Sequence, residues 1–546
     1  MAKQLLKILL IFIPVLLFVH CAQIAPLNGG KRDVEPPKLI EAIPANQSNN
    51  FNSARITLRF DEFVKLNDLS NQLIVSPKLK TTPEIESDGK TITILLIKNE
   101  LKPNTTYRIY LGQAVADMHE ANAIRNFEYV FSTGPYIDSL ELKGLVLDAF
   151  NNKPANNTII GLYHNSENTD SLPYKNVPDY IAKSDENGQF KFTNLPAATF
   201  KVYAYSDKNK NYLYDGETEK IAFLDPDLTL SSDSTVRFKL FQEESSKGFI
   251  KKTFLPYYGF MQIILNKKSL ITLQPLNPRD KENVFETLMN KEKDTVSVYY
   301  KNVTDTLGLI FRDQSRQKAD TLRITLPKKP PLGKKFKSMS LNSSGGALML
   351  GTQPTLSFLN WMDIQTANPL KISLRSREDS LIGTSPVTGK WLDITHYEIS
   401  SELKEGVNYN MKIDTNAFFD IYGISNDSIA MSFKTQSRVE YGKATLKLLF
   451  NKKQAYIIEL VNDKEQVVRR SFIDLPLSSS NAASLDFIDV APGTYQVKVI
   501  YDNNANKKWD TGNFLLKTQP EQIFISSKQI KVLSDWEIEE EISIKE

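Results

Sequence analysis

The sequence predicts an all-β chain made of antiparallel β-sandwiches in series. Short apolar or alternating runs recur after residue 38, Asn, Asp, Gly and Pro separate them, and no run keeps a helical period beyond two turns. With 546 residues, 41 % of them hydrophobic, the chain has material for several cores. Because no helices are available as crossovers, we expect antiparallel rather than parallel sheets.

The N-terminus predicts export and a lipid anchor. Lys3 and Lys7 precede an apolar run at residues 8–19, which is shorter than the about 20 residues that span a bilayer and is typical of a signal peptide. The one cysteine of the chain, Cys21, follows directly. This arrangement resembles a bacterial lipoprotein signal, which implies lipidation of Cys21, although His20 stands where that signal has a small residue. The alternative is an ordinary secretory signal with an incidental cysteine.

A short segment, residues 21–35, is expected to tether the first domain to the membrane. Gly29 and Gly30 make it flexible. The signal resembles lipoproteins of the Bacteroidetes type, in which an acidic cluster after the cysteine favours the outer face, and no such cluster follows Cys21. We therefore expect a protein held by lipid in the cell envelope, at the outer membrane, with the face of that membrane left open.

Seven runs read most clearly as strands, because β-branched and aromatic residues alternate with polar ones or lie in short apolar stretches. They are residues 55–60, 91–97, 107–112, 189–192, 200–205, 446–449 and 495–501.

A first module is expected over residues 36–136. Pro103 and Asn104 turn the chain into a strand in which Tyr107 can bury its ring while its hydroxyl caps a loop. Its marker residues are Pro36, Pro37, Pro44, Leu101, Pro103, Asn104, Thr106, Tyr107, Asp117, Phe131, Ser132, Thr133 and Gly134. On these residues the segment is similar to the bacterial Ig-like family first seen in surface-layer proteins, the SbsA type. The resemblance implies an Ig-like sandwich and says little about a ligand.

A second module is expected over residues 137–245. Residues 185–188 form a hairpin turn, and residues 194–196 turn the chain back. The residues that alternate inward are Phe190, Phe192, Phe200, Val202 and Ala204. The pattern resembles the carboxypeptidase-regulatory or transthyretin-like sandwich, a packing module that is not itself a peptidase.

Both modules recur. Residues 341–440 repeat the end of the first module, and residues 441–546 repeat the second, with a constant offset from Thr199 against Thr494 onward. Residues 246–340 between them form a further β-rich domain that ends in a proline-rich linker at residues 327–335. The echoes of the first module are Leu403, Gly406, Tyr409, Asp420, Gly423, Phe433 and Thr435.

The two copies of the second module share a pattern of oxygen-bearing residues, D-x-N-x-N-x-x-x-D. Alternate oxygen ligands in a tight loop are how hard cations such as calcium are held, but Thr218 and Asn513 stand where an EF-hand has its bidentate Glu. Two hypotheses remain: a weak structural calcium site, or a hairpin of Asx turns. The residues are Asp207, Asn209, Asn211 and Asp215 in one copy and Asp502, Asn504, Asn506 and Asp510 in the other.

The composition argues against nucleic-acid binding and against catalysis. A net charge of +3 gives no basic field for nucleic acid, and a single cysteine excludes an intrachain disulfide. His119, His164 and His396 lie in unrelated segments, and the common catalytic motifs are missing from the sequence. Lys328, Lys329, Lys334, Lys335 and Lys337 read as a solvated linker, or as a contact with anionic lipid or glycan.

We therefore expect a non-enzymatic, membrane-anchored lipoprotein of the cell envelope that acts as a structural or interaction module. Its partners would be the membrane, through the lipid, and an envelope protein or glycan, with no cofactor beyond structural calcium. The alternative is a lipoprotein that captures a glycan or peptide with aromatic residues at domain junctions. These are Tyr257, Tyr258, Phe260 and Trp361.

The calcium hypothesis predicts a change in thermal stability for the chain that begins at Ala22. Relative to EDTA, calcium at about 1–5 mM should raise the melting temperature, because weak extracellular sites fill in this range. Asp207→Ala combined with Asp502→Ala should remove the rise. An unchanged melting temperature in calcium would leave the loops as Asx-turn hairpins.

Overall fold

The all-β prediction is confirmed in the computed structural model of the chain, where the described helices span only three or four residues each. The structure describes residues 33–164, 171–245, 248–276, 285–303, 305–313, 319–327, 335–336, 339–343, 345–378, 381–385, 387–475 and 481–544. The signal and Cys21 lie outside these residues. Within them, the longest helices are far too short to cross a membrane. We use the expected boundaries as names: segments A (36–136), B (137–245), C (246–340), D (341–440) and E (441–546).

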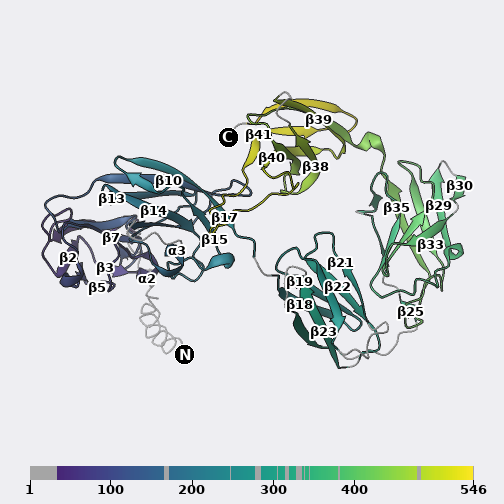
Figure 1. The fold of residues 1–546 in the computed structure, drawn as a ribbon, viewed down its shortest axis with the longest axis horizontal. Coiled ribbons are helices and arrows are strands. Elements are labelled where there is room, and N and C mark those ends of the chain that lie inside the picture. The colour runs from purple at the N-terminus through teal and green to yellow at the C-terminus, as the bar shows by residue number, and fades with distance from the viewer. Residues whose placement is uncertain are drawn as a thin grey trace, which may run out of the picture.

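All seven expected strands are present (Figure 1). Several extend by one to four residues beyond the sequence pattern, because hydrogen bonding to a neighbouring strand continues past the apolar run. One is shorter than predicted: β6 ends at Leu95 rather than at residue 97, because Ile97 begins the turn into a short 3-10 helix at Lys98–Glu100. The strands are β2 (Arg55–Phe60), β6 (Thr91–Leu95), β7 (Thr106–Gly112), β13 (Gln189–Leu195), β14 (Ala198–Tyr205), β36 (Gly442–Leu449) and β40 (Gly493–Asp502).

Segment A packs two sheets around one core. One sheet has the order β1 (Leu39–Ile43), β2, β6, β5 (Glu84–Asp88), and the other β4 (Ile74–Ser76), β7, β9 (Phe127–Ser132). Tyr107 stacks on Phe131 with ring centroids 5.3 Å apart. Its hydroxyl accepts the backbone N–H of Lys102 at 2.7 Å, so the predicted loop cap is confirmed.

Segment D repeats these contacts. One sheet has the strand order β26 (Met339–Leu341), β28 (Thr355–Phe358), β32 (His396–Ser400), β31 (Thr388–Trp391). The other has the order β27 (Ala347–Leu348), β35 (Ile429–Thr435), β33 (Asn408–Ile413), β29 (Ile372–Glu378), β30 (Leu381–Ser385). Tyr409 accepts the N–H of Lys404 at 2.9 Å and stacks on Phe433 at 5.6 Å. Asp117 and Asp420 correspond as well, since each accepts backbone N–H groups of the turn that follows it.

Segments B and E share a second architecture, and they correct one expectation. Most strand pairs are antiparallel, as predicted, but β10 (Leu140–Asp148) pairs in parallel with β17 (Ser234–Gln242), and β36 pairs in parallel with β42 (Glu537–Ser543). Each pair joins the first and last strand of its segment. The strands between them make the crossover, so a parallel pair forms without the helix that usually provides one.

Segment C consists of two sheets. One has the strand order β18 (Ile250–Tyr257), β19 (Phe260–Leu265), β22 (Thr295–Tyr300), β21 (Phe285–Met289), and the other the order β20 (Ile271–Pro275), β23 (Thr306–Asp313), β24 (Asp320–Thr325). It contacts segment D directly. The Tyr257 hydroxyl donates to the carbonyl of Leu359 at 2.7 Å, and the Tyr422 hydroxyl donates to the carbonyl of Tyr300 at 3.3 Å. Most of the predicted linker, residues 328–334, lies outside the described residues.

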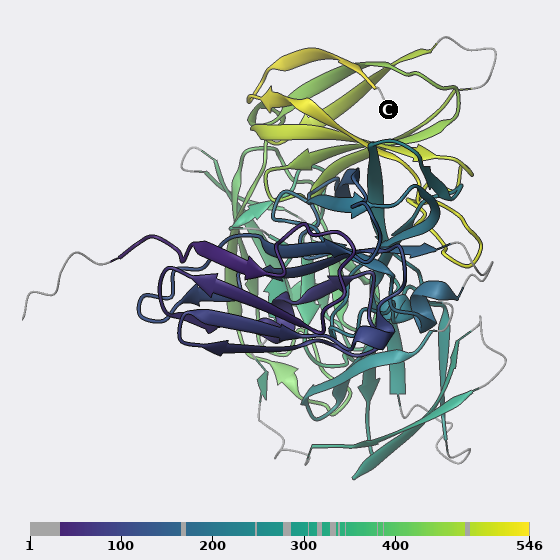
Figure 2. The same cartoon turned by 90° about the vertical axis from the view of Figure 1, so that its left-hand side faces the viewer.

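The chain does not run on as a straight string of sandwiches. Segment E returns to segment B, and a yellow loop of segment E reaches the strands β15 (Lys220–Phe223) and β17 in Figure 1. Within this contact, the Gln519 amide donates to the carbonyl of Phe223 at 3.1 Å. Figure 2 shows the yellow strands of segment E stacked on the blue and teal strands of segment B.

The capped tyrosine generates a prediction for the stability of segment A. Tyr107→Phe keeps the stacked ring but leaves the Lys102 N–H without its acceptor, which should cost about 1–2 kcal/mol. Hydrogen exchange should show faster exchange at the Lys102 amide. Tyr409→Phe should do the same at Lys404, whereas Tyr136→Phe, at a tyrosine that is 63 % exposed, should change nothing. Unaltered protection of Lys102 would contradict the prediction.

Candidate functional site

In the Asp/Asn loop of segment B, the four predicted side chains form hydrogen bonds with the loop backbone and with each other. The two carboxylate oxygens of Asp207 accept the backbone N–H groups of Asn211 and Tyr212, at 3.1 and 2.9 Å. One oxygen of Asp215 accepts the side-chain amides of Asn209 and Asn211, at 2.6 and 3.1 Å. The two asparagines form the Asx turns of the loop, since the side-chain oxygens of Asn209 and Asn211 accept the N–H groups of Asn211 and Leu213 at 3.4 and 2.7 Å.

The loop of segment E repeats this geometry. Asp502 accepts the N–H groups of Asn506 and Lys507 at 3.0 and 2.8 Å. Asp510 accepts the side-chain amides of Asn504 and Asn506 at 2.5 and 2.6 Å. All eight residues predicted from the repeated pattern therefore converge in two equivalent loops.

Each loop also contains a buried glutamate that the sequence analysis missed. Glu219, 2 % exposed, accepts the N–H groups of Lys208 and Asp215 at 2.7 and 2.9 Å. Glu521, 5 % exposed, bridges the same two backbone positions in the second loop, and burial raises its pKa. The sequence repeat does not reveal that these glutamates correspond, because their spacing from the loop aspartate differs. Glu219 comes four residues after Asp215, whereas a longer insertion separates Asp510 from Glu521.

Calcium at these loops stays a prediction. Within the described part of the chain, no three acidic, histidine or cysteine side chains are arranged around a point that could hold a metal ion. The oxygens of Asp207 and Asp502 already accept backbone N–H groups. A calcium ion would have to replace the amide contacts of Asp215 and Asp510.

The insertion before Glu521 forms the main contact between segments B and E. We call residues 511–521 the clasp loop. Phe514, at its centre, is fully buried although it leaves its own sandwich. Its ring lies 5.5 to 6.1 Å, centroid to centroid, from Tyr174, Tyr203, Tyr214 and Phe223 of segment B. An aromatic ring buried among four others is a strong apolar anchor.

A single carboxylate aligns this anchor. Glu243 accepts the Phe514 N–H at 2.8 Å with one oxygen and the Tyr214 hydroxyl at 2.7 Å with the other. Gly512 lies so close to Phe241 that a Cβ at this position would come within 2.6 Å of its ring. The clasp loop therefore needs glycine at position 512 so that its backbone can approach Phe241, and it needs Glu243 to orient Phe514.

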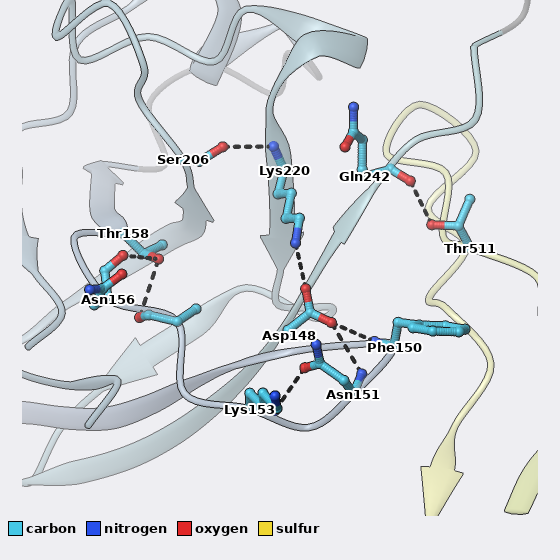
Figure 3. A network of polar contacts seen from close by, with 11 residues as sticks. Asp148, Phe150, Asn151, Lys153, Asn156, Thr158, Ser206, Lys220, Gln242 and Thr511 are labelled. Atoms are coloured by element: carbon cyan, nitrogen blue, oxygen red, sulfur yellow. Dashed lines mark hydrogen bonds and ion pairs between the residues drawn. The ribbon is translucent and has the colours of Figure 1, made fainter. Parts of the chain in front are cut away.

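Segment B contributes a phenylalanine in return, Phe150, which stays 47 % exposed. Asp148 accepts the Phe150 N–H at 2.9 Å and the Lys220 ammonium at 2.5 Å, which fixes the turn after β10 (Figure 3). The Phe150 ring makes an edge contact with Trp509 at 5.1 Å. The ammonium of Lys498 lies 3.4 Å from its centroid, a cation–π contact.

Hydrogen bonds to the backbone join the two segments around these rings. The Thr511 hydroxyl donates to the carbonyl of Gln242 at 2.7 Å, at the right of Figure 3. The Asn152 amide donates to the carbonyl of Ile523 at 2.8 Å. Burial at this contact lowers the pKa of Lys498, and the carboxylate of Glu459, 3.9 Å away, opposes that shift.

The two copies face each other through equivalent positions. Tyr203 and Lys498 correspond under the repeat, as do Tyr214 and Trp509. Tyr203 and Tyr214 receive Phe514, and Lys498 and Trp509 receive Phe150. Corresponding positions of the two copies therefore both lie at the contact, but the phenylalanines that they meet come from different loops, Phe514 from the clasp loop and Phe150 from the turn after β10.

The other sequence candidates are not brought together. His119 is exposed in segment A, His164 pairs with Asp179 in segment B, and His396 pairs with Asp393 in segment D. The junction aromatics do lie between segments C and D, where they are half-buried and pack on neighbours. The contacts are Tyr257 with Phe260, Tyr258 with Tyr300, and Trp361 with Lys301.

Comparison with known proteins supports the Ig-like assignment of segment A. Residues 33–133 match the family model described as a bacterial Ig-like domain. No curated protein matches the chain. Similar solved structures include the S-layer protein rSbsC(31-844), with 12 % identity over 90 % of this chain and 67 % of that one, and a TM-score of 0.14.

Two further structures are similar at the same level. BcpA, the major pilin subunit of Bacillus cereus, is 11 % identical over 74 % of this chain and 99 % of its own, with a TM-score of 0.15. E. coli alpha-2-macroglobulin is 11 % identical over 90 % of this chain and 42 % of its own, with a TM-score of 0.14. At these scores the likenesses carry no functional information.

The clasp loop gives a prediction about the shape of the molecule. Phe514→Ala removes the anchor and should weaken the contact of segments B and E by about 3–5 kcal/mol. Small-angle scattering should show a larger radius of gyration, and the amide of Phe514 should exchange faster. Leu516→Ala, at a side chain that is 76 % exposed two residues further on, is the matched control. Equal scattering of the two variants would contradict the prediction.

Proposed function

We propose that the chain is a non-enzymatic structural or interaction module of the cell envelope, anchored in a membrane by lipid on Cys21. The observation that supports this best is the long-range contact between segments B and E. It joins positions that are 269 and 371 residues apart, Gln242 with Thr511 and Asn152 with Ile523. Such contacts turn a tandem array into one body of defined shape.

The physical argument concerns freedom between domains. Sandwiches joined by short linkers move relative to each other unless a large contact holds them. Here segments C and D bridge the two clasped ends, and their own junction is held by the Tyr257 and Tyr422 hydroxyls. A closed arrangement suits a spacer or a scaffold that presents other surfaces, because the position of each segment is constrained by two neighbours.

The side chains of the contact support a packing role. The buried aromatic rings of the site pack on one another, and Glu243, Asp148 and Glu219 accept hydrogen bonds that fix backbone or side chains of the same contact. Calcium, if it binds the Asp/Asn loops, would stiffen the stem of the clasp loop. Its role would then be structural.

Capture of a glycan or peptide by the four aromatics between segments C and D has weaker support. These side chains are half-buried, and Tyr257 already donates its hydroxyl to Leu359. Their geometry suits the junction itself rather than an added ligand.

The anchor is tested by Cys21→Ser in the full chain. The wild-type protein should partition into the membrane fraction and incorporate a labelled fatty acid, because two or three acyl chains bind a bilayer far more tightly than one. The variant should lose the label and move to the soluble fraction. Retention of the variant in the membrane without label would overturn the lipid anchor while leaving the closed architecture, which the Phe514 variant tests, unaffected.

A further inference from the structure

The outer end of segment E carries apolar side chains that its fold does not require. Trp536 is 67 % exposed and Ile488 is 62 % exposed. The other three tryptophans of the chain are half-buried. Large exposed apolar side chains that gather in one place mark interaction sites on soluble proteins.

Segment B provides the internal control. The parallel ladders align Leu142 with Ser234 in segment B and Ala444 with Ile538 in segment E. Since Leu142 pairs with Phe192 and Ala444 with Phe487, the two ladders are equivalent. Trp536 lies two residues before Ile538 and Ser232 two residues before Ser234, so these two positions correspond. Ile488 follows Phe487 and Thr193 follows Phe192, so these two correspond as well. The same fold thus forms with small polar residues at both positions.

These side chains line a pocket between the last turn of segment D and the edge of segment E. Its volume is about 330 Å³, which lies at the small end of ligand sites. The lining residues are Arg438, Tyr441, Gly442, Lys443, Ile488, Asp489, Asp535, Trp536 and Glu537.

The backbone around the pocket is fixed before any ligand arrives. The Trp536 carbonyl accepts the Lys443 N–H at 2.9 Å. A Cβ on Gly442 would lie 2.3 Å from the carbonyl oxygen of Leu533, so only glycine allows this approach. Arg469 donates to the carbonyls of Ile488 and Asp489, which holds the opposite wall. A rigid pocket lowers the entropy cost of binding.

The chemistry of the lining identifies the kind of ligand. One indole offers a flat apolar surface, and charged side chains of both signs surround it: Arg438 and Lys443, with Asp489, Asp535 and Glu537. The cores of protein–protein interfaces are depleted of charged residues, so this lining is unlike one. Mixed donors and acceptors around a ring suit a ligand that has hydroxyl groups at its edge, an apolar face and little net charge.

We propose that this pocket binds a neutral glycan, with one pyranose ring stacked on Trp536 and its hydroxyls hydrogen-bonded to Asp489, Asp535 and Lys443. The ring hydrogens of a pyranose form an apolar face that packs on the indole. The carboxylates accept hydrogen bonds from the hydroxyls. The Lys443 ammonium is paired with Glu537 at 2.6 Å and with Asp486 at 3.1 Å, and its third N–H can donate to a hydroxyl. The site is separate from the contact of segments B and E, and it gives the closed body a surface for glycan.

Isothermal titration calorimetry of the chain from Ala22 onward, with cellohexaose, maltohexaose and chitohexaose as probes, tests the proposal. At least one should bind with a Kd of about 1 mM or tighter. Trp536→Ala should weaken binding at least about tenfold, and Trp536→Phe, which keeps an aromatic ring, should retain most of it. Asp489→Asn combined with Asp535→Asn should weaken it as well.

Leu516→Ala, at a leucine that is similarly exposed but lies on the clasp loop, is the matched control and should bind like the wild type. Circular dichroism and the melting temperature check that each variant is folded. The proposal is overturned if none of the three oligosaccharides binds at up to about 10 mM. It is also overturned if folded Trp536→Ala binds the oligosaccharides with the same affinity as the wild type. A patch that serves a protein partner instead would give one of these two results.

Discussion

The burial of Phe514 in segment B is the interaction on which the arrangement of the described chain depends. Four aromatic rings of another sandwich surround it, and Glu243 orients both the incoming backbone and one wall of its pocket. Without this anchor, segments B and E would keep only the Phe150 contacts, the hydrogen bonds of Asn152 and Thr511, and the connection through segments C and D. Because the contact links positions hundreds of residues apart, it converts a flexible series of sandwiches into a closed body.

Duplication explains why corresponding positions of segments B and E both lie at their contact. Segments B and E place corresponding positions at the contact, Tyr203 with Lys498 and Tyr214 with Trp509, and each pair meets a phenylalanine of the other segment. The copies differ where they face other surroundings. Segment E has Trp536 at an exposed position where segment B has Ser232. A shared fold can therefore hold two copies together and still give one of them a surface that the other does not have.

The Asp/Asn loops connect the repeated pattern to the architecture. In each loop, an aspartate accepts backbone N–H groups, asparagine side chains form Asx turns, and a buried glutamate, Glu219 or Glu521, accepts two further N–H groups. The clasp loop emerges from the second of these loops, between Asp510 and Glu521. Because hydrogen bonds hold the chain at both ends of the clasp loop, the segment that carries Phe514 can adopt fewer conformations. This restriction lowers the entropy lost when Phe514 docks.

Local patterning was sufficient to determine the all-β class, the seven strands, the capped Tyr107 and its counterpart Tyr409, and the eight oxygen-bearing residues, because alternation, turn residues and repeats are properties of short stretches. Tyr203 lies on β14 between the inward-facing Val202 and Ala204, yet it is buried, because Phe514 from a distant segment packs on it. The parallel pairs, the closing glutamates and the pocket beside Trp536 likewise depend on residues far apart in sequence. Only tertiary structure decided them, since long-range contact is set by complementary surfaces and leaves no period in the sequence.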